Sequence, residues 1–181
     1  EFSKLHAILE RRINRSMTTP KRNKLNALYT RLEPGTPLMS EDLAALGISA
    51  DLAVHYVRAG WLTRLARGVY CRPNETLALG PCLALLERRF EGLHVGGKTA
   101  LDWHGVRQYV ARQPVLRLYG WRSGQLPAWF TDRFPAEYYR KRLFDEQPGA
   151  LRNVNPFEGE AGAPRVSAPE RALLEMLSEV G

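Results

Sequence analysis

Residues 36–72 read TPLMSEDLAALGISADLAVHYVRAGWLTRLARGVYCR, a stretch with the signals of two short helices followed by a hairpin. Ser40 and Ser49 are predicted to cap the helices, because a serine hydroxyl accepts a hydrogen bond from a backbone N–H of the first turn. Gly47 and Gly60 are predicted to end them, since glycine readily adopts the left-handed conformation found there. The side chains expected to be buried are the apolar ones: Leu43, Ala44, Leu46, Leu52, Ala53, Tyr56 and Val57.

The hairpin is predicted from the second half of this stretch. Strands over 61–65 and 69–72 are joined by Ala66-Arg67-Gly68, where the glycine supplies a turn conformation that most residues disfavour. Two capped helices followed by a hairpin are typical of a winged helix-turn-helix, whose second helix enters the major groove of DNA. We therefore expect an α+β protein with an N-terminal winged helix-turn-helix followed by a small mixed domain with a short sheet.

The composition is that of an ordinary globular protein of one large or two small domains, with 181 residues, 44% hydrophobic and 25% charged. A run of 18 apolar residues is lacking, so no membrane span is predicted. The N-terminus lacks a secretory signal pattern, so a cytoplasmic protein is expected. Cys71 and Cys82 are too few for a disulfide framework and are interpreted as buried thiols.

The positive charge is concentrated in the first part of the chain. The net charge is +7; residues 17–72 hold 8 basic and 4 acidic groups (8 − 4 = +4), whereas residues 73–181 hold 14 and 13 (14 − 13 = +1). A surplus of this kind is what a phosphate-binding module requires. The alternative is a basic surface that is merely solvated.

A further helix is predicted over 20–33, with an apolar face formed by Leu25, Leu28, Tyr29 and Leu32. Its first turn holds three cations at the end that the helix dipole makes unfavourable for them, namely Lys21, Arg22 and Lys24. A nearby phosphate would favour them there, and a solvated helix end is the alternative. Met17 resembles a natural start, so residues 1–16 are expected to be an added segment and 17–73 the first domain.

The second domain is expected over 74–181. Its predicted helices cover 77–90 and 98–104, and its predicted strands cover 115–121, 137–144, 151–154 and 164–166, with a turn or short strand over 126–134. Ser167 and Glu170 form a capping-box pattern that starts a last helix. The core-facing residues expected on that helix are Ala172, Leu173, Leu174, Met176 and Leu177. An apolar helix this close to the last residue predicts that the domain continues past residue 181.

Candidate DNA contacts lie on the second short helix and on the hairpin. The helix face opposite the core carries Ser49, Asp51, His55 and Arg58, and the hairpin carries Arg64, Arg67 and Arg72. Arg67, at the tip, is the best candidate for phosphate or minor-groove contact. A second basic surface is predicted on a strand, where alternation places Arg140 and Arg142 on one face and Lys141 on the other. It could continue the DNA path or dock an acidic partner.

Residues 92–99 read GLHVGGKT and match the phosphate-loop pattern G-x-x-x-x-G-K-[ST]. Such a loop follows a buried strand, whereas the segment before this one is predicted to be a helix. His94 and His104 stand ten residues apart, without a partner at metal-ligand spacing. We therefore predict no catalytic residue, no metal and no cofactor. A nuclease or nucleotide-dependent enzyme is the less favoured alternative.

Three motifs together resemble one known family. They are GWLTRLARGVY at 60–70, GGKTALDWHG at 96–105 and SAPERALLE at 167–175. In this order and spacing they resemble the AbiEi family, the antitoxins of type IV toxin–antitoxin (abortive infection) systems. In that family the second motif leads into a helix and binds no nucleotide.

The resemblance implies a function and two partners. It implies a winged helix that binds repeats in the promoter of its own operon and represses it. It also implies a C-terminal domain that counteracts a cognate nucleotidyltransferase-like toxin. No membrane partner is expected, since no membrane span is predicted. A second reading stays open, in which the winged fold is a protein-interaction module that does not use DNA.

Overall fold

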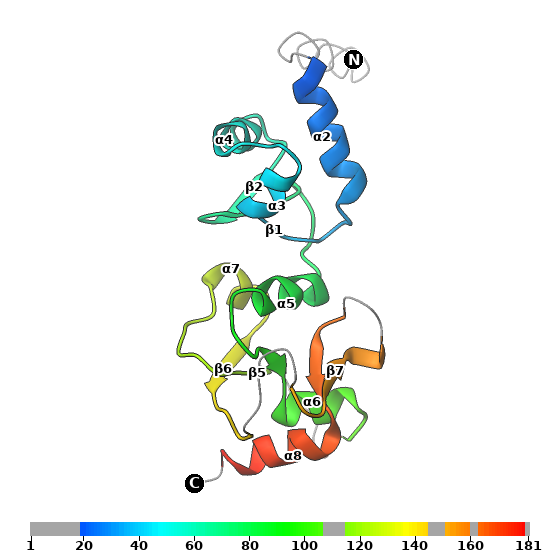
Figure 1. Cartoon of the computed structure of the whole chain (residues 1–181), viewed down its shortest axis with the longest axis vertical. Coiled ribbons are helices and arrows are strands. Elements are labelled where there is room, and N and C mark those ends of the chain that lie inside the picture. The colour runs from blue at the N-terminus through cyan, green and yellow to red at the C-terminus, as the bar shows by residue number, and fades with distance from the viewer. Residues whose placement is uncertain (1–18, 107–114, 145–150, 160–162, 180–181) are drawn as a thin grey trace, which may run out of the picture.

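The computed structural model describes residues 19–106, 115–144, 151–159 and 163–179, which form two parts along one long axis (Figure 1). The first part contains α2 (Thr19–Arg31), β1 (Leu38–Met39), α3 (Ser40–Ala45), α4 (Ala50–Arg58), β2 (Thr63–Ala66) and β3 (Val69–Cys71). The second contains α5 (Leu79–Glu87), β4 (His94–Val95), α6 (Gly97–Trp103), β5 (Leu116–Gly120), α7 (Ala128–Thr131), β6 (Ala136–Arg140), β7 (Val154–Pro156), η2 (Phe157–Gly159), β8 (Arg165–Ser167) and α8 (Pro169–Leu177). The predicted α+β class is confirmed.

The second of the two short helices, α4, begins and ends as its sequence predicts. The Ser49 hydroxyl accepts a hydrogen bond from the Leu52 N–H at 3.3 Å, so the predicted cap is confirmed. Gly47, before α4, and Gly60, after it, have φ values of 73° and 75°, in the left-handed region that favours glycine. Local signals alone therefore determine the bounds of this helix.

The first short helix, α3, differs in two details from its prediction. Ser40 is the first helical residue rather than the cap, and the Asp42 carboxylate accepts a hydrogen bond from the Met39 N–H at 2.8 Å instead. Ala44 is exposed rather than buried, while Leu43 fills the core. An exposed alanine costs little because its side chain is a single methyl group.

The predicted hairpin is present as β2 and β3, and it is attached to α3. Its turn has Gly68 at φ 74°, and the Ser40 N–H donates to the Gly68 carbonyl at 2.9 Å. The strand β2 begins at Thr63, two residues later than predicted, and its pairing with β3 shifts between Arg64 and Ala66. With β1 the hairpin forms a three-stranded sheet in the order β1-β3-β2.

The core of the first part lies between α2, α3, α4 and one face of this sheet. It is built from nine buried side chains: Leu25, Leu28, Leu32, Leu43, Ile48, Ala53, Tyr56, Leu62 and Tyr70. The apolar face predicted for the first long helix is therefore confirmed, with Tyr29 packed at its edge.

The second part is built on a mixed five-stranded sheet in the order β6-β5-β4-β8-β7. Strand β4 pairs antiparallel with β5 and parallel with β8, β5 pairs parallel with β6, and β7 pairs antiparallel with β8. Four predicted segments need correction here. Strand β6 ends at Arg140 instead of continuing to 144, the segment over 126–134 contains helix α7, and β7 and β8 lie later than predicted.

The two faces of this sheet pack against different helices. Val95, Leu118 and Val166 lie in register and join the apolar core beneath α5. On the neighbouring positions His94 and Tyr119 point to the opposite face, where α6 and α8 lie. The layers are therefore α5 and α7 on one side and α6 and α8 on the other (Figure 1).

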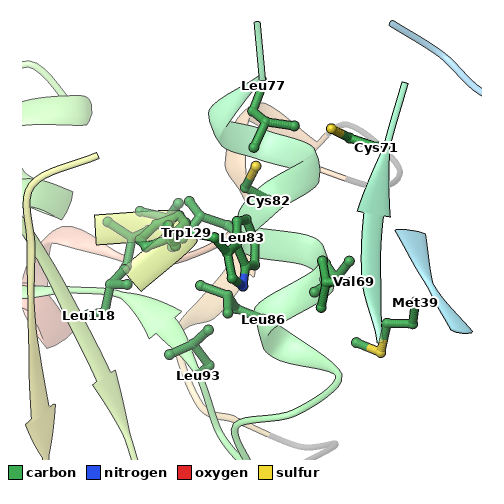
Figure 2. Close-up of a cluster of buried hydrophobic side chains, with 14 of the residues drawn as sticks. Met39, Val69, Cys71, Leu77, Cys82, Leu83, Leu86, Leu93, Leu118 and Trp129 are labelled. Carbon is green, nitrogen blue, oxygen red and sulfur yellow. The ribbon is translucent and has the colours of Figure 1, made fainter. Parts of the chain in front are cut away.

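The three-stranded sheet of the first part is also buried on its second face. Met39, Val69 and Cys71 point away from α4 and join the core of the second part, beside Leu83 and Leu86 of α5 (Figure 2). The predicted boundary after residue 73 thus falls between two elements that share one core.

Helix α8 buries Ala172 as predicted and leaves Met176 half-buried, but the prediction is wrong for its three leucines. Its leucines point outward, with Leu173, Leu174 and Leu177 exposed by 45%, 49% and 54%. Its buried side chains are Ala172 and the charged pair Arg171 and Glu175. Ser167 does not cap α8, because it ends β8 and Ala168 occupies the capping position.

Both cysteines are free and buried, as predicted. Burial raises the pKa of the Cys82 thiol to about 12 and raises that of Cys71. Among the described residues no helix is long and apolar enough to cross a bilayer.

Candidate nucleic-acid interface

Helix α4 presents one face to solvent. Asp51, Val54 and Arg58 are exposed on that face, at the spacing of successive helical turns. His55 is half-buried, and its ring meets Trp61 edge-on with the centroids 6.3 Å apart. The hydroxyl of Ser49 accepts from the backbone at the start of the helix. The structure therefore brings the four predicted α4 residues together and holds two of them by internal contacts.

Val54 is not among the residues predicted from the sequence. Its side chain is 42% exposed. A single valine between polar positions gives no periodic signal, so only the orientation of the helix reveals it.

The hairpin carries two exposed guanidinium groups. Arg67 lies at the turn, and Arg64 lies on β2, with its Nε donating to the Ala66 carbonyl at 3.3 Å. The bond between the Ser40 N–H and the Gly68 carbonyl fixes this turn against α3. A backbone bond therefore holds the turn that carries Arg67 in place against α3.

Arg72 has a different environment from the other hairpin cations. Its Nη2 donates to the carbonyl oxygens of Tyr29 and Leu32, the latter at 2.6 Å, and its Nη1 lies 3.3 Å from the Glu75 carboxylate. Its guanidinium also stacks on the Tyr29 ring. Arg72 thus binds the end of α2, where helix carbonyls lack intrahelical partners, and we leave it out of the DNA-binding set.

Of the three cations at the start of α2, only Lys24 has a described side chain. Its Nζ donates to the Gly47 carbonyl at 2.6 Å, which ties α2 to the turn between α3 and α4. Lys21 and Arg22 belong to the first turns of α2, and their side chains lie outside the described residues.

The second basic surface is not the two-sided strand that the sequence predicts. Arg140 is exposed at the end of β6, but the next two residues lie beyond the strand. Lys141 donates to the Ser178 carbonyl and hydroxyl at the end of α8, and the Arg142 guanidinium stacks on Trp121. Two of the three cations therefore hold the second part together.

The phosphate-loop lookalike encloses an internal carboxylate. Glu175 of α8 accepts a hydrogen bond from the Gly97 N–H, at the start of α6, at 3.0 Å. This is the position at which helix N-termini bind anions. A Cβ at Gly96 would overlap both Glu175 and Tyr119, so the glycine permits this close approach. Within the loop His94 and Val95 form β4, so the segment is a strand rather than an open phosphate cradle.

Glu175 accepts three further side-chain bonds. His94 Nε2 lies 2.8 Å away, Arg171 Nε 2.7 Å away, and the Ser167 hydroxyl 3.0 Å from each carboxylate oxygen. Burial acts to raise the pKa of Glu175, but the bonds from His94, Arg171 and Gly97 outweigh it and lower the pKa below its ordinary value. His94 Nδ1 faces the Gly92 carbonyl at 2.7 Å, so only the doubly protonated ring donates at both nitrogens.

This charged cluster connects α8 to the sheet and to α6, and its polar groups have partners. In the described ranges no group of three or more His, Cys, Asp or Glu residues is placed to hold a metal ion. The arrangement serves packing, and it offers neither a metal site nor an open anion site.

The comparisons with known proteins give the family. Residues 21–112 match the description "Transcriptional regulator, AbiEi antitoxin N-terminal domain", and residues 113–181 match "Transcriptional regulator, AbiEi antitoxin, Type IV TA system". Both descriptions are of transcriptional regulators. The chain belongs to the AbiEi family, the antitoxins of type IV toxin–antitoxin systems.

Comparison with solved structures gives a similar fold. It is found in the crystal structure of the RV2827C protein from Mycobacterium tuberculosis, with a TM-score of 0.53 and 16% identity over 88% of this chain. The match covers 61% of that protein, so this chain spans less than two thirds of its length. No curated protein matches the chain.

Proposed function

We propose that the chain is a sequence-specific DNA-binding repressor of its own operon and acts there as a type IV antitoxin. The observation that carries this proposal is the set of exposed guanidinium groups on two adjacent elements, Arg58 on α4 and Arg64 and Arg67 on the hairpin. Guanidinium groups bind phosphates and the acceptor edge of guanine. We interpret α3, α4 and the hairpin as a winged helix-turn-helix.

In this mechanism α4 lies in the major groove and the hairpin follows the DNA backbone as the wing. Arg58, with Asp51 and His55, faces the bases, while Arg64 and Arg67 contact phosphates. Lys21, Arg22 and Ser49 are proposed as further backbone contacts. The bonds Ser40–Gly68 and Lys24–Gly47 support the proposal, because they hold the wing and α2 in place before DNA arrives.

The proposal for the promoter repeats and the toxin is supported by family membership. We propose that the operator consists of repeats upstream of the chain's own gene, and that the second part counteracts a nucleotidyltransferase-like toxin. The chain's membership of the AbiEi antitoxins supports this role.

The test is a gel shift of the full chain on its own upstream region, beside a scrambled duplex of equal length. We expect a preference for the upstream region and an affinity that falls steeply with salt. Arg67→Ala should weaken binding to both duplexes. It should also reduce the slope of the logarithm of the binding constant against the logarithm of the salt concentration by about one. Arg89→Ala, an exposed arginine near the end of α5, is the matched control and should bind as the wild type does.

A protein-interaction module is the second candidate, because three leucines of α8 are exposed. It predicts that neither duplex binds at physiological salt. Equal binding of the upstream and scrambled duplexes would also contradict sequence-specific repression.

A further inference from the structure

Val54 is an exception in its part of the molecule. Among the described residues of α2 to β3, it is the one large hydrophobic side chain that is more than a third exposed. The other large hydrophobic side chains exposed to this extent, within the part of the chain that the structure describes, lie in the second part, on α8 or in connecting segments: Val106, Val115, Leu143, Leu173, Leu174 and Leu177.

Its position on α4 is central. Asp51 precedes it by three residues and Arg58 follows it by four, so the valine lies between the two exposed charged groups of the same face. Ala53 and Tyr56 fix this orientation, because they are buried on the other side of the helix. The Ser49 cap fixes where the helix begins.

Intrinsic helix preference does not account for a valine here. A β-branched side chain is a weaker helix former than most polar residues, and an exposed apolar surface gains nothing from water. In the major groove the situation differs. The base edges there present hydrogen-bonding groups and one apolar group, the C5-methyl of thymine.

We infer that Val54 is a specificity-determining residue that reads a thymine methyl in the operator, and this inference rests on the proposed function. Val54 and Arg58 are four residues apart, which is about 6 Å along the helix axis. Successive base pairs are separated by about 3.4 Å. The operator half-site should therefore contain a thymine about two base steps from the guanine that Arg58 contacts.

The neighbouring side chains agree with this assignment. Asp51 is repelled by phosphate and so belongs over the bases, where a carboxylate accepts from cytosine. His55 is half-buried and its ring packs edge-on against Trp61, whereas Val54 is exposed and makes no such ring contact. Val54 is thus the apolar group that meets the base edges.

The test removes one thymine methyl group at a time from the DNA. After footprinting locates the operator, each thymine is replaced in turn by deoxyuridine, which lacks only the methyl group. Wild-type protein should lose about fourfold in affinity at one thymine per half-site, the effect of one methyl-sized contact. Val54→Ala should bind the unmodified operator less tightly and should show no further loss on that replacement.

Leu174→Ala is the matched control, since it removes an exposed apolar side chain away from α4, and it should keep the wild-type sensitivity to deoxyuridine. Wild-type binding that no deoxyuridine replacement changes would overturn the inference while leaving the repressor proposal intact. The same conclusion would follow if Val54→Ala retained the full fourfold loss. Absence of specific binding by the wild type would instead overturn the proposed function itself.

Discussion

At the scale of single residues, Glu175 determines how the last helix is held. Its carboxylate is 1% exposed and accepts hydrogen bonds from His94, Arg171, Ser167 and the Gly97 N–H. A buried carboxylate is stable only when it is paired and fully hydrogen-bonded. Removing its charge therefore leaves several buried donors, among them the Arg171 guanidinium, without their charged acceptor.

Glu175→Gln should lower the free energy of unfolding by about 3 kcal/mol at pH 7. Because folding lowers the pKa of Glu175, its stabilising effect is present above the unfolded pKa of about 4.5 and is lost as pH falls through the folded value. Urea unfolding from pH 7 to pH 3 should show the difference between wild type and variant shrinking in acid.

Glu170→Gln is the control for this change, since Glu170 is exposed in the first turn of the same helix. It should unfold close to the wild type at every pH. A difference between wild type and Glu175→Gln that stayed constant down to pH 3 would show that folding does not lower the pKa of Glu175.

A second prediction at this scale separates two arginines of the hairpin. Arg72 donates to carbonyl oxygens at the end of α2, whereas Arg67 is exposed. Arg72→Ala should lower the free energy of unfolding by about 2 kcal/mol. Arg67→Ala should leave stability within about 0.5 kcal/mol and weaken DNA binding. Thermal unfolding followed by circular dichroism measures the first effect, and equal melting temperatures for the two variants would contradict the assignment.

At the scale of elements, local signals predicted the first part well. Ser49, Gly47, Gly60 and Gly68 act within a few residues of their own positions, so α4 and the hairpin could be derived from the sequence. The segments that were misplaced depend on distant partners. Strand β7 pairs with β8 across residues 157–164, and β6 ends where Lys141 turns toward α8. A sequence pattern does not carry such contacts.

The same distinction applies to the candidate site. The residue types on α4 and the hairpin were predictable, because helical spacing places them on one face. Whether a cation is free was not predictable. Arg72, Lys24 and Arg142 resemble the other basic residues in sequence, and only the fold brings a carbonyl or an aromatic ring to each of them.

Helix α8 shows the limit of periodicity most clearly, since its pattern defines two faces without saying which one is buried. The face that carries Glu175 is the buried one, because its carboxylate forms hydrogen bonds with His94, Arg171 and the Gly97 N–H. The double change Leu174→Gln with Leu177→Gln should therefore alter the free energy of unfolding by less than about 1 kcal/mol.

Leu83→Ala on α5 provides the comparison, since that side chain is 1% exposed. It should cost about 2–5 kcal/mol in the same urea titration. If the double change Leu174→Gln with Leu177→Gln lowered the free energy of unfolding by a similar amount, the leucine face of α8 would be covered in solution.

At the scale of the whole molecule, the shared sheet unites the two parts. One face carries Tyr70 toward the first core, and the other carries Met39, Val69 and Cys71 toward the second. Two contacts reinforce this join: the Arg88–Asp42 ion pair at 2.9 Å, and the bond from the Ala78 N–H to the Gly35 carbonyl at 3.0 Å.

A fragment ending at residue 73 tests how far the first part depends on the second. Without α5 it would expose Met39, Val69 and Cys71, so we expect it to melt well below the full chain and to bind apolar dyes. Circular dichroism and dye fluorescence of fragment 17–73 beside 17–181 provide the measurement. A fragment that melts cooperatively at the temperature of the full chain would show that the three-stranded sheet is stable without α5 packed on its second face.

The shared sheet also restricts how the sequence can vary. A larger side chain at Val69 must be matched by a smaller one at Leu83 or Leu86, because all three fill one packed volume. Related chains should therefore vary freely on the proposed DNA-binding face of α4, while residues on either side of position 73 change in compensating pairs. Recombination between two such genes at that position would separate the pairs. If α4 binds the operator as proposed, new operator specificities should therefore arise by point substitution on α4 rather than by exchange of whole N-terminal halves.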